Sequence, residues 1–392
     1  MDTKTEGLFH YRTLSDKERK NLAILELIRK KSPLSRTEIS RLTDINIVSI
    51  SNYIKDYIDK NIVLETGCDV SSGGRRPELV ELNTKGVFVI GLDIGPSKII
   101  AILADLTINI LAKTESPAPT GAEEPITNKV IGLIQELIKK LNVDVSKIKA
   151  IGIGSSGTPI RLMDTRSAVQ KNFGVNTFIG SDAACAAFGE KKLNPQADVE
   201  DLLYMYSDVG CGIIVRGDIY FGAGGNAGET KISREHVSKE EEVVLFKGTQ
   251  YLRPWGEDLG ITQMAKREIE KGVGTKIVTC AKGNTKNITT DVVVEAAIQD
   301  DDVAVDIIRN AGMNLGIRIA YLVNLFNPEV VVIGGGVEKA REIILDPIRK
   351  TVKKLAFSEQ ANIVKIIPGA MGENSVSLGA ASLAIREVFL KA

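Results

Sequence analysis

The stretch GVFVIGLDIGPSKIIAILADLTINILAKT, residues 86–114, decides the fold. Two Val/Ile-rich runs are joined by the turn Asp93-Ile94-Gly95-Pro96-Ser97-Lys98, and a third apolar run follows. Short β-branched runs bounded by turn residues are typical of strands, so the stretch predicts three consecutive antiparallel strands. A carboxylate on such a turn could hold a metal-bound phosphate, and the small residues let the backbone approach it.

The elements that follow extend this beginning into an α/β unit. Residues 126–142, ITNKVIGLIQELIKKLN, have the apolar spacing of an amphipathic helix, and residues 149–157, KAIGIGSSG, read as a strand that ends in small residues. A second strand, glycine turn and strand at 201–222, DLLYMYSDVGCGIIVRGDIYFG, places Asp208 in a position related to that of Asp93. The chain is therefore predicted to be internally duplicated.

A glycine run near the end of the chain is a further candidate phosphate site. NPEVVVIGGGVEKA, residues 327–340, is a predicted buried strand that leads into Gly334–Gly336 at the start of a helix. Backbone N–H groups at such a place favour a nucleotide's phosphates or sugar. A glycine turn between strands is usually only a turn, so the order of these motifs is more informative than any one of them.

The segment before residue 85 is a candidate DNA reader. Leu22, Leu25 and Ile28 recur at helical spacing, and Ser35-Arg36-Thr37-Glu38 has the form of a capping box that opens a second short helix. In the third predicted helix, within residues 45–61, an apolar stripe leaves a small polar face pointing outward. Such a face can enter a major groove. The candidate base and backbone contacts are Arg36, Asn46, Ser49, Ser51 and Asn52.

A two-stranded ribbon is predicted from residues 62–65 and 79–82, with Gly73, Gly74, Arg75 and Arg76 at its tip. Arginines on a glycine-rich tip suit a narrow, electronegative minor groove. Residues 17–60 hold ten Lys/Arg against six Asp/Glu, an excess that suits phosphate positioning and not strong non-specific binding. The alternative is a helical module that docks a protein partner, because short helix-turn-helix patterns also arise by chance.

Composition narrows the function classes. The 392 residues indicate two or three domains, and 50 Lys+Arg against 50 Asp+Glu exclude a globally basic nucleic-acid coat. The four cysteines Cys68, Cys185, Cys211 and Cys280 lie far apart, so neither a disulfide framework nor a zinc ribbon is expected. The charged first residues lack the apolar core of a signal peptide, and no run reaches the ~18 apolar residues of a membrane span. We therefore expect a soluble protein of the reducing cytoplasm, with no membrane contact.

The order of the motifs resembles the ROK family (repressors, open reading frames and kinases) of the actin/hexokinase-like fold. The Asp-x-Gly turn, the Gly-x-Gly turn at Gly210–Gly212 and the glycine run follow one another, with NAGE at 226–229 between the last two. FIGSDAACAAFGE at 178–190 is similar to the family's E-N-D-A-x-x-A-A segment, and Ser49-Ile50-Ser51-Asn52 to the centre of its recognition helix. The resemblance covers the chain from about Arg19.

The resemblance implies an α/β fold: an N-terminal winged helix-turn-helix followed by a two-lobed actin/hexokinase-like (RNase H-like) body. The expected domains are residues 1–84 for DNA binding, 85–180 for the first lobe, completed by the C-terminal helix 376–392, and 181–375 for the second lobe. In family kinases the Asp of the Asn-Asp pair is the general base, and Asp182 is its counterpart here, expected to be vestigial. The expected vestiges of a nucleotide site are Asp93, Gly95, Lys98, Gly210, Gly212, Gly334 and Gly335.

Departures from the family pattern argue against catalysis. Pro96 offers no N–H to a phosphate, and Asp208 adds a carboxylate where a polyphosphate would lie. The family's zinc cluster should follow NAGE, yet residues 230–260 contain no cysteine, and the usual Gly-His after Glu229 reads Lys231-Ile232. We therefore expect no metal, no cofactor and a remodelled pocket.

The expected function is a transcriptional regulator of carbohydrate genes, with repression the expected sign, that binds double-stranded operator DNA as a homodimer or a dimer of dimers. A sugar, sugar derivative or polyol is expected in the cleft between the lobes. The candidate effector contacts are Ser156, Gly157, Ser181, Asp182, Asn226 and Glu229, which could instead hydrogen-bond only within the interlobe hinge. The alternatives are an ATP-dependent sugar kinase with a DNA-binding head, and a scaffold that has lost both functions; the polar face of the third helix argues against the scaffold.

Overall fold

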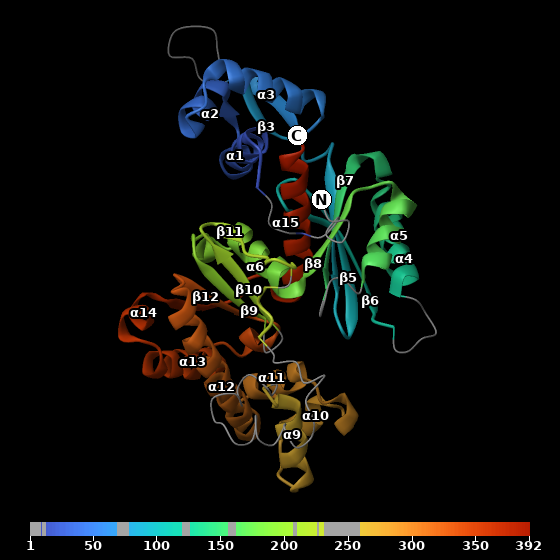
Figure 1. Ribbon diagram of the computed structural model, residues 1–392. Coiled ribbons are helices and arrows are strands. Elements are labelled where there is room, and N and C mark those ends of the chain that lie inside the picture. Colours follow the sequence, from blue (N-terminus) through green and yellow to red (C-terminus); the bar gives the residue numbers. More distant parts are fainter. Residues whose placement is uncertain are drawn as a thin grey trace. The chain divides into compact units, whose positions relative to one another are not determined.

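The computed structural model describes residues 9, 13–68, 78–119, 126–155, 162–206, 210–225, 227–230 and 259–392 (Figure 1). The chain forms two compact units. The first consists of residues 1–185, 222–225 and 376–392, and the second of residues 186–221 and 226–375. Within the described ranges, no helix combines the length and the apolar character needed to cross a membrane.

The first unit begins with a small winged domain. Its helices are α1 (Asp16–Lys31), α2 (Arg36–Thr43) and α3 (Ile47–Asp59), and its sheet has the order β1 (Leu34–Ser35), β3 (Glu78–Leu82), β2 (Val63–Cys68) with antiparallel pairing. Ile24, Leu25, Ile28, Ile50 and Ile54 are fully buried and form its core. The three helices and the ribbon predicted from the sequence are confirmed. The two-residue strand β1 was not predicted, because two residues carry no periodicity.

Capping explains where two of these helices begin. The predicted capping box of α2 is present: the Ser35 hydroxyl accepts from the Glu38 N–H, and the Glu38 carboxylate accepts from the Ser35 N–H at 2.9 Å. Ser15 and Glu18 form a second box at the start of α1. Helix α2 ends at Thr43, where Asp44 adopts the left-handed conformation. The turn into α3 is therefore specified locally.

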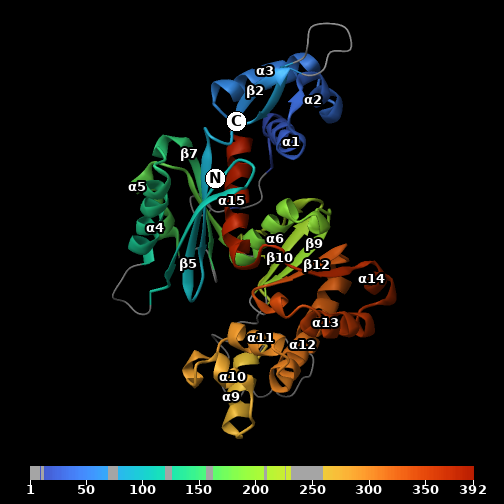
Figure 2. The same cartoon turned by 180° about the vertical axis from the view of Figure 1, so that it is seen from behind.

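The body of the first unit is a five-stranded sheet. Its order is β6 (Ile110–Pro117), β5 (Lys98–Asp105), β4 (Phe88–Ile94), β7 (Ile148–Ser155), β8 (Thr177–Ser181). Strands β4, β5 and β6 are antiparallel neighbours as predicted, and β7 and β8 continue in parallel. Helices α4 (Ile126–Leu141) and α5 (Met163–Phe173) lie beside this sheet (Figure 2). Their buried side chains contribute to its core.

Helix α15 (Ser375–Leu390) packs against this sheet at unusually close range. A Cβ at Gly91 would lie 2.0 Å from the Ser377 oxygen, and one at Gly152 would lie 2.1 Å from the Ala380 oxygen. Glycine at these two strand positions therefore lets the helix backbone approach the strands. Residues from the far end of the chain thus complete the first unit.

The second unit repeats the strand arrangement of the first. Its order is β11 (Asp218–Ile219), β10 (Gly210–Val215), β9 (Leu202–Tyr206), β12 (Val330–Gly334), β13 (Lys365–Pro368), again three antiparallel strands followed by two parallel ones. The predicted internal duplication is confirmed by this shared order. Among the described residues, the other α-helices are α6 (Asp182–Leu193), which begins in the first unit, and α9 (Ile261–Glu270), α10 (Lys276–Cys280), α11 (Thr290–Ile298), α12 (Asp302–Phe326), α13 (Glu342–Leu355) and α14 (Ser358–Ile363). Single 3-10 turns are η1 (Val145–Lys147), η3 (Pro195–Ala197), η5 (Thr285–Asn287), η6 (Val337–Ala340) and η7 (Gly372–Asn374).

Candidate functional site

Polar side chains gather at one edge of the first sheet. Strands β4, β7 and β8 are parallel, so their carboxyl ends meet at the same edge. In register, Ile94 lies opposite Ser155, and Ser155 lies opposite Ser181. Asp93 is the penultimate residue of β4, and Asp182 follows β8 directly as the first residue of α6. This edge therefore holds two predicted site residues, Ser181 and Asp182, and one residue predicted for a nucleotide, Asp93.

The start of α6 holds Asp182 in place. Its Oδ1 atom accepts from the Ala183 N–H at 2.7 Å, and the Ser181 hydroxyl accepts from the Ala184 N–H at 3.3 Å. The side chains of both residues are buried, and Asp182 lies in the first turn of α6. The arrangement presents a fixed acceptor that could bind ligand hydroxyl groups.

Asp93 and Asp182 influence each other electrostatically. Burial raises the pKa of Asp93 to about 7, the charge of Asp182 adds to this increase, and Lys98 opposes it. Burial also raises the pKa of the Cys185 thiol, with contributions from the same two carboxylates. Asp93 is therefore partly protonated near neutral pH, which makes it a poor ligand for a cation. The sequence placed these two carboxyl groups in separate sites and did not predict that they form a pair.

The turn after β4 uses its Gly95 backbone donor within the turn. The Gly95 N–H donates to the Lys98 oxygen at 3.1 Å within the turn, and Pro96 has no N–H. Lys98 itself lies 3.7 Å from the Glu115 carboxylate. The Gly95 N–H is thus used within the turn, and Pro96 has no N–H to offer.

The glycine run after β12 also makes its contacts within the chain. A Cβ at Gly334 would lie 1.8 Å from the Tyr204 hydroxyl, so packing against that buried tyrosine accounts for glycine there. The Gly336 N–H donates to the Glu338 carboxylate at 2.7 Å, and burial raises the pKa of Glu338. The run leads into the 3-10 turn η6, where the sequence predicted an ordinary helix start. An N–H that could serve a nucleotide is therefore satisfied by the chain itself.

Gly228 and Glu229 of the NAGE segment pair with the start of β10. The Cys211 N–H donates to the Gly228 oxygen at 2.7 Å, and a Cβ at Gly228 would lie 1.7 Å from the Cys211 oxygen. Gly210 forms a bridge with Glu229, whose side chain is exposed, and Gly212 lies opposite Tyr204 in the sheet. The backbone of Gly228 and Glu229 is thus held against β10, and the Glu229 side chain is exposed.

The outward face of α3 matches the sequence prediction. Asn46, Ser51 and Asn52 are exposed, and Ser49 is half-buried. Asn46 caps the helix by accepting from the Ser49 N–H at 2.8 Å, and the Ser51 hydroxyl donates to the Ile47 oxygen. Sequence reasoning missed the exposed apolar pair on the same helix, Ile47 at 44% and Val48 at 68% exposure. An apolar side chain beside polar ones can contact a thymine methyl group.

Arg36 holds the ribbon against α2. Its guanidinium donates to Glu65 of β2 and, at 3.2 Å, to Glu78 of β3. It therefore contacts protein carboxylates in this structure, and its contact with DNA stays a prediction. The predicted contacts Arg75, Arg76, Ser156, Gly157 and Asn226 lie outside the described residues, as do Asp208 and the stretch 231–258.

A buried polar network that the sequence analysis missed joins the winged domain to α15. The Tyr57 hydroxyl of α3 donates to the Asn21 Oδ1 atom of α1 at 2.8 Å. The Asn21 amide donates in turn to the backbone oxygens of Leu390, at 3.3 Å, and Ala392, at 2.7 Å. One signal could have revealed it: Asn21 stands at a helical spacing from Ile24, Leu25 and Ile28, on the apolar stripe of α1.

Comparison with known proteins places this architecture in a family. A model of the ROK family matches residues 89–230 and 263–387. The xylose repressor of Caldicellulosiruptor bescii is 28% identical over 389 residues, covering 95% of this chain and 96% of its own. The transcriptional dual regulator NagC of Escherichia coli K12 is 24% identical over 390 residues, covering 94% and 93%.

Solved structures of two ROK family proteins have a similar fold. The crystal structure of a ROK family transcriptional regulator, a homolog of the E. coli MLC protein, superposes with a TM-score of 0.76 at 21% identity, over 95% of this chain and 96% of its own. A ROK family glucokinase from Streptomyces griseus, in complex with glucose and AMPPNP, superposes with a TM-score of 0.61 at 25% identity, over 76% and 99%. The fold predicted from the sequence is confirmed, and because the family model matches well over half of its residues, this chain belongs to the ROK family.

Proposed function

We propose that this protein is a DNA-binding transcriptional repressor of carbohydrate genes that is released from its operator by a sugar, a sugar derivative or a polyol. One observation carries the proposal: a domain of three helices and a two-stranded ribbon, with a small, polar, exposed face on α3, is joined to a kinase-like body in which the Gly95 and Gly336 N–H groups already donate within the chain. Relatives that match nearly the whole chain are named repressors of xylose and of N-acetylglucosamine.

Helix α3 is the proposed reader of the major groove. Asn52 is exposed and free to form two hydrogen bonds to adenine, and Ser51 lies beside it. Val48 adds an apolar contact on the same face. Arg75 and Arg76 at the wing tip are the proposed minor-groove contacts. Together these contacts would separate base readout by the helix from positioning by the wing.

Ser181 and Asp182 are the proposed effector contacts of the first unit. Asp182 is buried, fixed by the Ala183 N–H, and acceptor-only when ionised, as vicinal hydroxyl groups require. Ser156, Gly157, Asn226 and Glu229 remain predicted effector contacts from the sequence. An effector can shift the protein between two states only if it binds them with different affinities.

The body is proposed to lack kinase activity. Phosphoryl transfer depends on positioning and charge neutralisation of the phosphates. The Gly95 N–H is used within its turn, Pro96 has none, and Glu338 holds the Gly336 N–H. Zinc is not expected either, and the described part of the chain contains no group of three or more His, Cys, Asp or Glu side chains arranged to hold a metal ion.

The test begins with selection of bound fragments from genomic DNA by the full-length protein. Release of a selected fragment is then titrated with xylose, N-acetylglucosamine and inositol. Asp182→Asn is expected to bind the fragment normally but to need at least about tenfold more effector for release. Asp164→Asn, an exposed carboxylate on α5, is the matched control. Joint loss of thermal stability and DNA binding in Asp182→Asn would support a purely structural role in the hinge.

A sugar kinase is the second candidate, and one observation favours it. Asp182 is buried at the position of the family's general base, in a body that superposes on a ROK glucokinase. ADP production is measured with a panel of sugars and ATP. Turnover that is abolished by Asp182→Asn would assign the protein to the kinases, whereas we expect none above background.

Dimerisation is proposed to use the exposed side of α12. Met313, Ile317, Tyr321 and Leu325 are spaced four residues apart and are 36–61% exposed, so they form one apolar stripe along the helix. The Phe357 N–H donates to the Asn324 side chain of α12 at 2.9 Å, which places the 71%-exposed Phe357 beside the stripe. A twofold axis can bring such a stripe against its own copy.

A further inference from the structure

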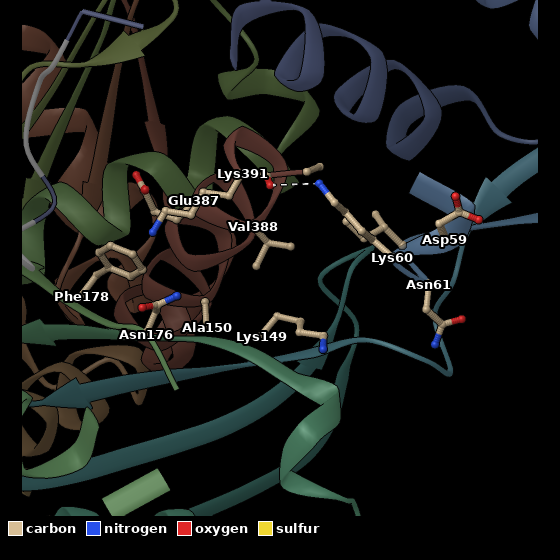
Figure 3. A pocket seen from close by; sticks show the side chains of 12 residues that line it. Asp59, Lys60, Asn61, Lys149, Ala150, Asn176, Phe178, Glu387, Val388 and Lys391 are labelled. Carbon is tan, nitrogen blue, oxygen red and sulfur yellow. Dashed lines mark hydrogen bonds between the residues drawn. The ribbon is translucent and has the colours of Figure 1, made fainter. Parts of the chain in front are cut away.

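A cavity of about 510 Å³ lies within the first unit, where the winged domain meets the five-stranded sheet and α15 (Figure 3). The end of α3 contributes Asp59, and Lys60 and Asn61 follow directly. The sheet contributes Lys149 at the start of β7 and Phe178 of β8, and α15 contributes Val388, with Lys391 just beyond its end. The volume lies in the range of small-molecule sites. Neither the proposed operator contacts nor Asp182 line this cavity.

Three ammonium groups line the cavity without a carboxylate partner in the part of the chain that the structure describes. Lys149 donates to the Ser146 oxygen at 2.8 Å, Lys60 donates to the Lys391 oxygen at 3.5 Å, and the Lys391 ammonium lies 5.2 Å from the centre of the Phe178 ring. Two carboxylates also line the cavity. One of them, the Glu387 carboxylate, lies 3.7 Å from the Arg386 guanidinium. Among the side chains that line the cavity, the three lysines therefore outnumber the remaining carboxylate, Asp59. The cavity therefore favours an anion.

The residues that line the cavity indicate the chemical class of the anion. The lysines act as point charges, and no arginine lines the cavity to select a planar carboxylate, so a tetrahedral phosphate suits the cationic groups. Figure 3 shows Val388 and Ala150 between the Phe178 ring on one side and Lys60 and Lys149 on the other. This apolar floor has room for a compact organic body, and the side-chain amide of Asn176, which also lines the cavity, offers a donor and an acceptor.

We propose that this cavity is a second ligand site, which binds a small organic phosphate between the end of α3 and the end of α15. Lys60 and Lys149 hold the phosphate, and the organic body packs on Val388 and Phe178. A ligand in this place contacts the winged domain and the body of the first unit at once. It therefore restrains the winged domain, and by linkage it changes DNA affinity if the restrained position differs from the bound one. That consequence, unlike the binding itself, rests on the proposed function.

Calorimetric titration of the full-length protein with phenyl phosphate, at constant ionic strength, tests the site. Phenyl phosphate supplies both chemical parts, and benzyl alcohol is the uncharged control. Lys149→Met is expected to weaken binding at least about tenfold, because a charge-assisted hydrogen bond is lost. Lys147→Met, an exposed lysine two residues away that does not line the cavity, should bind like the wild type. Equal binding by the two variants, or no binding by the wild type, would overturn the proposal.

Hydrogen exchange locates the ligand independently of DNA binding. With phenyl phosphate bound, the amides of residues 60–62, 149–150 and 388–392 are expected to exchange more slowly, while those around Asp182 remain unchanged. Protection confined to the edge of the sheet near Asp93 and Asp182 would instead show that the phosphate occupies the effector region. That result would contradict a second site.

Discussion

At the residue scale, the pair formed by Asp93 and Asp182 is the most consequential feature of the body. In the unfolded chain the Asp93 carboxyl has an ordinary pKa near 4, whereas burial beside Asp182 raises it to about 7. Between these values the folded protein binds more protons than the unfolded chain. The free energy of unfolding therefore falls as the pH rises from about 4 to about 7, by up to roughly 2–4 kcal/mol from this group.

Asp93→Asn should remove this pH dependence. The amide has no charge to desolvate, so the free energy of unfolding should depend less on pH between about 4 and 7, and the variant should be more stable than the wild type near pH 7.5. Urea unfolding at several pH values measures the effect. Asp164→Asn, at an exposed site, should keep the wild-type pH dependence. An unchanged slope in Asp93→Asn would contradict the raised pKa of Asp93 in the folded protein.

Asn52 permits a second prediction at this scale. Its side chain is exposed on α3, so Asn52→Ala should leave folding intact and cost roughly 1–3 kcal/mol of operator affinity, with a relaxed preference at one base pair. Fluorescence anisotropy with the selected operator and single-base variants measures both effects. Asn172→Ala, an exposed asparagine on α5, serves as the control. Wild-type affinity and base preference in Asn52→Ala would move the reading face away from this part of α3.

At the element scale, helix α15 joins distant parts of the first unit. Val376 near its start lies within van der Waals range of Gly154, and its end is bound by Asn21 of the winged domain. Tyr57 and Asn21 are both buried, so the bond from Tyr57 to Asn21 and the bonds from Asn21 to the carbonyls of Leu390 and Ala392 replace bonds to water. The end of the helix is thus held to the winged domain by buried hydrogen bonds.

Tyr57→Phe tests that contact. The substitution keeps the ring but leaves the buried Asn21 oxygen without its donor, at an expected cost of about 1–3 kcal/mol in the free energy of unfolding. Hydrogen exchange in residues 388–392 should accelerate at the same time. Tyr53→Phe, one turn earlier on the same helix, should change the free energy of unfolding by no more than about 0.5 kcal/mol. It should leave hydrogen exchange in residues 388–392 as in the wild type. Equal effects of the two substitutions would mean that the network does not anchor α15.

The elements differ in how far the sequence could predict them. The strands of residues 86–114, the capping box at Ser35 and the polar face of α3 follow from local patterns, and all three were predicted. The proximity of Asp93 to Asp182 depends on the register of β4, β7 and β8, which no local pattern states. Likewise, the hydrogen bond between Glu338 and the Gly336 N–H depends on the positive φ of Gly335 and Gly336. Residues that meet only through tertiary structure therefore escaped the sequence analysis.

At the scale of the whole molecule, duplication has left two sheets of the same strand order with different attachments. The first unit carries the winged domain, and the second carries α12 with its apolar stripe. A repressor that reads two operator half-sites needs two winged domains. The second copy must then come from another chain, and the exposed stripe of α12 is the surface that we expect it to cover.

Leu325→Glu should separate the two chains. Leu325 is 61% exposed, so the variant should fold normally, but a carboxylate buried at a twofold contact would meet its own copy and should raise the dissociation constant of the dimer roughly 10–100-fold. Sedimentation equilibrium measures this constant. Ile298→Glu, a 54%-exposed position on α11, introduces the same charge outside the stripe and should leave the dimer intact.

Operator binding should fall with dimerisation. A single winged domain binds each half-site weakly, and joining two winged domains in a dimer makes the second contact intramolecular. The dimeric wild type should therefore bind an operator with two half-sites at least about a hundredfold more tightly than Leu325→Glu does. For a single half-site the two proteins should bind equally, because the winged domain itself is unaltered. A Leu325→Glu protein that remains dimeric while Ile298→Glu dissociates would instead place the interface on α11. If Leu325→Glu binds the full operator as tightly as the wild type although it is monomeric, DNA recognition would not require the second chain.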